Sequence, residues 1–112
     1  MPRPVPKVSE ADVERIARRD FGEAHLTLVL SLLDEISKTE KRSARVSLAV
    51  LKLAAGSMDR LLDSVQLAAS DYRDVIGPAE YPSYSWFDKD PVRQQQAMEA
   101  DWQQYTEWLN KA

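Results

Sequence analysis

The stretch Leu-Thr-Leu-Val-Leu-Ser-Leu-Leu-Asp-Glu-Ile, residues 26–36, decides the fold class. Its apolar side chains recur at helical spacing on one face, and two more leucines widen that face. The first face comprises Leu26, Val29, Leu30, Leu33 and Ile36, and the second comprises Leu28 and Leu32. Such a wide apolar arc predicts a helix over about residues 23–36 that is buried on most sides. We therefore expect this helix at the centre of a helical bundle.

A second apolar helix is predicted over about residues 40–55, with Gly56 as its C-terminal stop. Only Arg45 and Lys52 interrupt its apolar surface, so this helix is also expected to be largely buried. The residues expected at the centre of the core come from both helices and are Leu30, Leu33, Val50 and Leu53.

Capping residues and prolines predict the remaining helices. Ser9 followed by Asp12 resembles a capping box and predicts a helix over about residues 10–20. Ser57 predicts the start of a helix over about residues 58–76, which Gly77 and Pro78 would end. In the last third, Asp90 and Pro91 predict the start of a further helix. The inward stripe expected on that helix is Met98, Trp102, Tyr105 and Leu109.

No segment shows sustained two-residue alternation, so the sequence predicts an all-α fold without a sheet. We expect one domain over residues 9–112, a single helical bundle of four or five helices. Residues 1–8 contain three alternating prolines and are expected to form a flexible Pro-rich tail with almost nothing to bury.

Composition excludes several kinds of chemistry. The 112-residue chain has no cysteine, which rules out disulfides, thiolate nucleophiles and cysteine-based zinc sites. His25 is the only histidine, so a histidine-rich metal site is also ruled out. We expect no metal and no cofactor. The longest apolar run, residues 26–33, is far shorter than the ~20 residues that a membrane-spanning helix needs. We expect no membrane association and a cytoplasmic location.

Charge argues against a nucleic-acid partner. The formal net charge is −3, whereas binding to phosphate requires at least one basic face. The strongest basic cluster is Lys38, Lys41, Arg42 and Arg45. A cluster of this kind is more often a solvated helix start than a phosphate site.

Large aromatic rings gather in the last third of the chain, and two interpretations of them stay open. The rings are Tyr81, Tyr84, Trp86, Phe87 and Trp102. The segment 78–88 would either fold back as a lid on its own bundle or form a binding surface, because Tyr and Trp dominate interface hot spots. We therefore expect a non-catalytic protein-interaction or self-association module with an unidentified protein partner. A symmetric homodimer is the expected form of self-association.

An enzymatic alternative depends on Arg19 and His25. The spacing of Arg19, Asp20 and His25 resembles the Arg-polar-…-His signature of HEPN ribonucleases, small helical bundles that act as dimers. That resemblance implies metal-independent RNA cleavage, with Arg19 stabilising the phosphate and His25 transferring a proton. It covers seven residues, lies early in the chain where the family carries its signature late, and is interrupted by Gly22.

A second resemblance covers residues 44–84. The strings at residues 51–53, 71–75 and 79–82, Leu-Lys-Leu, Asp-Tyr-Arg-Asp-Val and Ala-Glu-Tyr-Pro, are similar to a small helical family of uncharacterised bacterial proteins. The resemblance implies a bacterial source and a helix followed by a loop with proline and tyrosine. It implies no activity.

Overall fold

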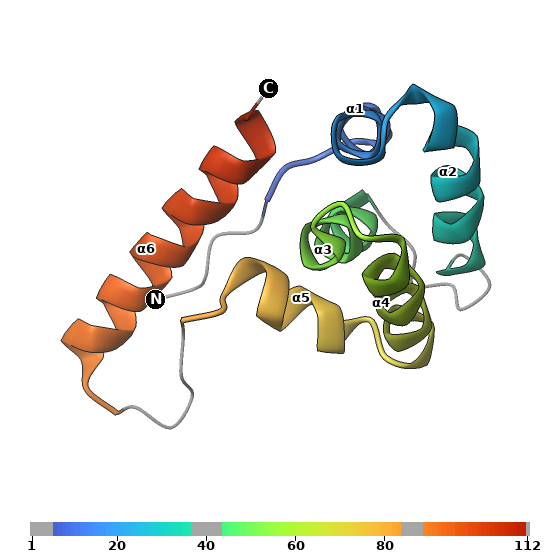
Figure 1. Ribbon diagram of the computed structural model, residues 1–112. Coiled ribbons are helices and arrows are strands. Elements are labelled where there is room, and N and C mark those ends of the chain that lie inside the picture. The colour runs from blue at the N-terminus through green and yellow to red at the C-terminus, as the bar shows by residue number, and fades with distance from the viewer. Residues whose placement is uncertain (1–5, 37–43, 84–88, 112) are drawn as a thin grey trace.

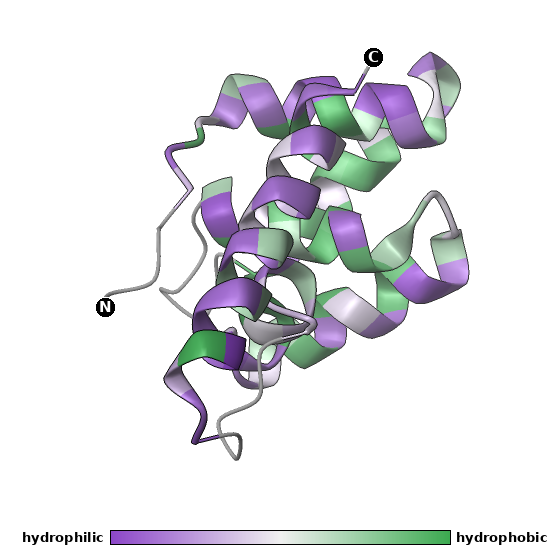
Figure 2. Ribbon diagram, turned by 90° about the vertical axis from the view of Figure 1, so that its left-hand side faces the viewer, coloured by the Kyte–Doolittle hydropathy of each residue, from purple (hydrophilic) through white to green (hydrophobic). Residues whose placement is uncertain are grey.

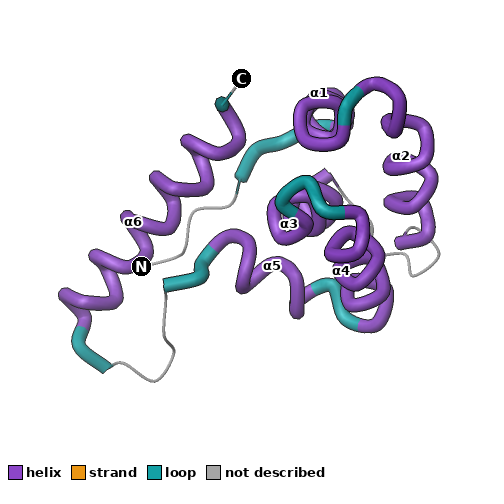
Figure 3. The backbone as a smooth tube through the Cα atoms, viewed as in Figure 1, coloured by secondary structure: helices purple, strands orange, loops and turns teal. Residues whose placement is uncertain are grey.

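The computed structural model describes residues 6–36, 44–83 and 89–111. These residues form six α-helices and short 3₁₀ stretches, and they contain no strand (Figure 3). The elements are α1 (Glu10–Phe21), η1 (Glu23–His25), α2 (Leu26–Asp34), α3 (Ala44–Ala54), α4 (Met58–Ser70), α5 (Arg73–Glu80) and α6 (Pro91–Asn110). The all-α prediction is confirmed, although the described residues already hold six α-helices where the sequence predicted four or five.

Helix α3 is the centre of the fold. Six consecutive residues, 46–51, are buried, so the helix is covered on all sides. Helices α1, α4 and α5 pack around it (Figure 1). Three neighbouring helices bury the apolar surface of α3, which extends around most of its circumference. The predicted burial of this second apolar helix is confirmed.

The expectation that the helix over residues 23–36 lies at the centre is wrong. Gly22 has a φ of 83°, and the chain turns there into η1, so the α-helix itself starts only at Leu26. Helix α2 lies at the edge of the molecule and buries a single face (Figure 1). Leu28, on the second apolar face, is 50% exposed. Of the four expected core residues, Leu33 and Val50 are fully buried, whereas Leu30 and Leu53 are partly buried against the core.

The single helix predicted over residues 58–76 is two helices. Helix α4 ends at Ser70, because Asp71 has extended backbone angles (φ −153°, ψ 109°). The Asp71 carboxylate accepts a hydrogen bond from the backbone N–H of Arg73 at 3.0 Å and so starts α5. Gly77 and Pro78 lie inside α5 and do not end it. The last turn closes after the proline, where the Tyr81 N–H donates to the Gly77 carbonyl oxygen at 2.8 Å.

The predicted N-caps are present. The Asp12 carboxylate accepts a hydrogen bond from the Ser9 N–H at 3.0 Å, which is half of the expected capping box. The Ser57 hydroxyl accepts from the Arg60 N–H at 3.4 Å. At the start of α6, Asp90 accepts from the Val92 N–H at 2.9 Å, and Pro91 occupies the first helical turn.

Helix α6 stands beside the core formed by α1 to α5. Its buried residues Met98 and Tyr105 lie outside the main hydrophobic cluster, whereas its partly buried residues Trp108 and Leu109 pack against that cluster. Residues 6–9 run between α6 and α3 toward α1 (Figure 1). Figure 2, viewed from the side of α6, shows that the outer surface of this helix is largely hydrophilic. Helix α6 therefore turns a polar surface outward and its apolar residues toward the core.

We predict that Leu51→Ala lowers the free energy of unfolding by about 2–5 kcal/mol, because the residue is fully buried in α3. Leu28→Ala is the matched control, and its half-exposed side chain should cost less than about 1 kcal/mol. Urea denaturation followed by far-UV circular dichroism measures both. Equal costs for the two variants would show that α3 is not the centre of the fold.

Candidate functional site

An ion pair between α3 and α5 fixes the region on which α6 rests. Arg45 donates two hydrogen bonds to Glu80, from Nε at 2.8 Å and from Nη2 at 2.7 Å. Glu80 is 2% exposed, and a buried carboxylate is costly unless it is paired, so the two hydrogen bonds from Arg45 compensate for its burial. The hydrogen bonds to Glu80 raise the pKa of Arg45 above its usual range.

Arg45 belongs to the basic cluster considered for phosphate contact, yet its guanidinium is bonded to Glu80 inside the fold. Lys38, Lys41 and Arg42 lie outside the described residues.

A buried carboxylate anchors the middle of α6. Asp101 is 2% exposed, and its two oxygens accept hydrogen bonds from the backbone N–H of Ser83 at 3.2 and 3.0 Å. Helix α6 is thereby attached to the segment that follows α5. Lys52 of α3 interacts with the same carboxylate: burial lowers the pKa of Lys52, and the charge of Asp101 acts in the opposite direction.

Arg19 anchors the C-terminal end of α6. Its Nη1 donates to the carbonyl oxygens of Trp108 at 2.6 Å and of Lys111 at 2.8 Å. The guanidinium lies 5.3 Å from the centroid of the Trp108 ring, within range of a cation–π contact, and Nε donates to Asp20. A cation that bonds the last carbonyls of a helix satisfies unpaired acceptors and complements the helix dipole. Arg19 therefore connects α1 to α6.

Tyr105 lies between these two anchors, on the inner face of α6. It is 1% exposed, and its ring meets that of Trp108 at a centroid distance of 5.5 Å. Within the described part of the chain, its buried hydroxyl has no hydrogen-bond partner. Burial, assisted by the negative charge of Glu80, raises the pKa of Tyr105 far above its usual value. The hydroxyl therefore stays protonated at any physiological pH.

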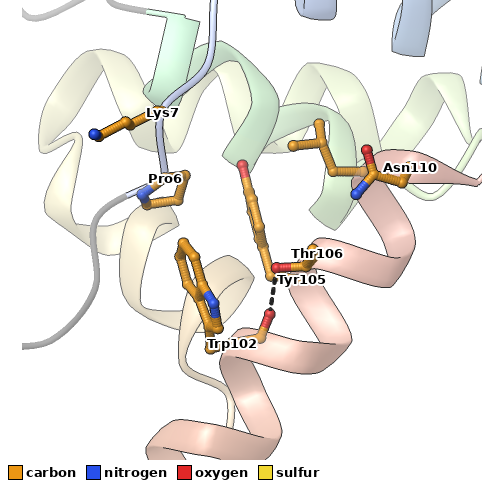
Figure 4. A pocket seen from close by; sticks show the side chains of 7 residues that line it. Pro6, Lys7, Trp102, Tyr105, Thr106 and Asn110 are labelled. Carbon is orange, nitrogen blue, oxygen red and sulfur yellow. Dashed lines mark hydrogen bonds between the residues drawn. The ribbon is translucent and has the colours of Figure 1, made fainter.

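A pocket of about 540 Å³ opens beside Tyr105, between α6 and the N-terminal segment. The side chains around it are Pro6, Lys7, Trp102, Tyr105, Thr106, Leu109 and Asn110. Figure 4 shows the rings of Trp102 and Tyr105 side by side, with Pro6 across from the indole. The Thr106 hydroxyl donates to the Trp102 carbonyl oxygen at 2.8 Å, which holds it against its own helix. The pocket therefore presents mainly rings and aliphatic carbon.

The structure separates the aromatic residues that were predicted to bind. Trp102 is half-buried and lines the pocket. Tyr81 is 5% exposed and packs inside the fold, which favours the lid interpretation for this residue. Tyr84, Trp86 and Phe87 lie outside the described residues, so their predicted role stays a prediction.

Sequence reasoning missed Pro6 and Lys7 as parts of a site. Residues 1–7 were expected to bury almost nothing, yet Pro6 is buried and Val8 packs partly against the core. The predicted flexibility of residues 1–8 stays a prediction. The available signal was the pairing of a proline-rich segment with an aromatic helix stripe, since prolines pack well on aromatic rings.

The two residues of the ribonuclease hypothesis have different surroundings. Arg19 is partly buried and bonded to the end of α6, whereas His25 is exposed in η1. The His25 Nδ1 lies 3.2 Å from the Phe21 carbonyl oxygen, a contact it makes as an N–H donor. Arg19 thus has a structural function that the resemblance did not imply. The catalytic hypothesis stays a prediction.

Other classes of site find no support in the described residues. Among them, no three His, Asp or Glu side chains are grouped as metal ligands would be. No helix in the described ranges combines the length and hydropathy required to cross a bilayer. Comparison of the chain with protein-family models, curated proteins and solved structures finds no match in any of the three.

We predict that Arg19→Lys loosens the last turns of α6, because an ammonium lacks the forked donors and flat face of the guanidinium. Amide hydrogen exchange at residues 105–110 should accelerate, and the free energy of unfolding should fall by about 1–3 kcal/mol. Arg15→Lys on the same helix is the control, since Arg15 makes an exposed pair with Asp12. Unchanged exchange in Arg19→Lys would contradict the anchoring function.

We predict that Tyr105→Phe does not destabilise the protein at pH 7, because it removes a buried hydroxyl that makes no hydrogen bond to any described residue. The folded-state pKa of Tyr105 is raised, so its contribution to stability is complete below the unfolded pKa of about 10 and is lost as pH rises above that value. Wild-type stability should fall more steeply above pH 10 than that of Tyr105→Phe. Urea denaturation from pH 7 to pH 11 measures this, and identical slopes would show that Tyr105 ionises freely.

Proposed function

We propose that this chain is a non-catalytic interaction module that binds a partner protein through the pocket beside α6. The observation that carries the proposal is the composition of the pocket wall. Trp102, Tyr105 and Leu109 supply aromatic and aliphatic surface, and Lys7 and Asn110 add polar groups to it. A mostly apolar concavity with a few polar groups is typical of a binding site.

The chemistry of the lining supports binding over catalysis. General acid–base catalysis needs a group that exchanges a proton near neutral pH, and covalent catalysis needs an activated nucleophile. Among the described residues of the wall, the titratable side chains are Lys7 and Tyr105. Lys7 is exposed, and the raised pKa of Tyr105 keeps its hydroxyl protonated. Neither residue is prepared for a chemical step.

Self-association is part of the same proposal. Three leucines outside the pocket are large and exposed: Leu28 at 50%, Leu62 at 43% and Leu67 at 42%. Exposed apolar side chains supply the surface that two copies of a chain bury when they associate. A homodimer would be measured by light scattering on the samples used for binding.

Peptide selection tests the proposal. The immobilised full chain selects from a library of random 12-residue peptides, and the selected peptides are then titrated against three proteins. We predict saturable binding to wild type, a loss of about 30-fold or more in Trp102→Ala, and no change in Val92→Ala. Trp102 lines the pocket and Val92 is an exposed apolar residue of the same helix outside it, so the pair separates the pocket from the general apolar surface.

Binding that survives Trp102→Ala would place the interaction site elsewhere on the chain. Circular dichroism of each variant excludes a loss of folding as the cause. Metal-independent RNA cleavage that disappears in both His25→Ala and Arg19→Ala would overturn the proposal and support the ribonuclease alternative.

A further inference from the structure

The chain places one of its own prolines in the pocket. Pro6 is buried, belongs to a segment without helical structure, and faces the Trp102 indole across the pocket (Figure 4). The volume of about 540 Å³ is what remains with Pro6 in position. That volume falls within the range of sites that accept small ligands. Pro6 therefore occupies one part of a concave surface that extends further along α6.

Aromatic walls of this kind suit extended proline-containing peptides. Such peptides adopt the polyproline II conformation before binding, so little conformational entropy is lost when they dock in aromatic grooves. Trp102 and Tyr105 supply neighbouring rings, and Leu109 extends the wall by about one helical turn. The indole N–H of Trp102 and the side-chain amide of Asn110 are donors of the type that peptide carbonyls accept.

The chain's own sequence supports the same class of ligand. Pro6, which lines the pocket, is the last of three prolines at every second position, 2, 4 and 6. The charged side chain of the pocket wall is Lys7, so the wall gives no preference for a basic peptide. Proline spacing therefore specifies the ligand, and charge does not.

We infer that the pocket recognises a proline-containing extended peptide of a partner protein, and that Pro6 of the chain itself competes for the same wall. The inference rests on the proposed function and adds two elements to it, the chemical class of the partner segment and a competitor within the chain. Binding of the partner peptide requires Pro6 to leave Trp102, so the apparent affinity is the intrinsic affinity multiplied by the fraction of chains with a free pocket.

The test is a fluorescence-anisotropy titration of the full chain with a labelled synthetic peptide, Met-Pro-Arg-Pro-Val-Pro-Lys-Val, the sequence of residues 1–8. Pro6→Ala in the protein should bind this peptide about tenfold more tightly than wild type, as for a pocket that is free about a tenth of the time. Trp102→Ala should weaken binding by about 30-fold or more. Val92→Ala, an exposed position on the same helix, should bind like wild type.

A second peptide, in which all three prolines are replaced by alanine, has the same charge and should bind at least about tenfold more weakly than the first. Equal binding of the two peptides would overturn proline recognition. Wild-type affinity in the Pro6→Ala protein would overturn the competition. If neither peptide binds while library-selected peptides bind in a Trp102-dependent manner, the proposed function stands and the peptide class inferred here is wrong. Trp102→Phe, which keeps a ring at this position, separates loss of the wall from loss of folding.

Discussion

The ion pair between Arg45 and Glu80 is the interaction on which the arrangement around α6 depends. Burying a carboxylate is costly unless it is hydrogen-bonded, and Arg45 of the central helix donates two hydrogen bonds to Glu80, which is 2% exposed. The pair fixes the last turn of α5, which sets where the chain leaves that helix. Three residues later, the backbone of Ser83 donates to Asp101 of α6. Polar contacts thus continue from the centre of the core to the helix that forms the pocket.

Polar contacts at two points hold α6 in addition to its apolar packing. Asp101 fixes its middle, Arg19 fixes its C-terminal end, and Tyr105 packs between them. A helix held in this way keeps its position even where the surface under it is incompletely filled. Trp102 and Leu109 remain half-buried for that reason, and the N-terminal segment covers part of the surface that the core does not reach.

Local chemistry in the sequence predicted much of the fold. Ser9, Ser57 and Asp90 mark helix starts through hydrogen bonds within three residues, and these starts are where they were expected. The break between α4 and α5 at Asp71 is equally local, because the Asp71 carboxylate accepts a hydrogen bond from the Arg73 N–H. This contact leaves the helical spacing of the apolar residues intact, so the spacing did not predict the break. The centre was misplaced because periodicity reports how much of a helix is apolar and does not report which neighbours cover it.

The candidate site was less predictable because its contacts join distant parts of the chain. Arg45 and Glu80 are 35 residues apart, and Arg19 and Trp108 are 89 apart. Neither pair leaves a mark in local spacing. Trp102 was predicted as a binding residue because its side chain is a large aromatic ring. Pro6 was not predicted, because its place beside Trp102 depends on how the two ends of the chain pack in the fold.

Helix α1 limits the movement that the proposed competition requires. The Ser9 cap lies three residues after Pro6, and Arg19 near the other end of α1 holds α6. Val13, Ile16 and Ala17 bury α1 in the core, so the helix stays in place whether or not Pro6 contacts Trp102. Displacing Pro6 would then require movement of only the short segment before Ser9, while the wall formed by α6 keeps its position. A competitor attached to a fixed helix has a high effective concentration at the pocket, yet one proline ring offers far less contact than a longer peptide. A partner peptide that covers Trp102, Tyr105 and Leu109 together would therefore displace it without unfolding any helix.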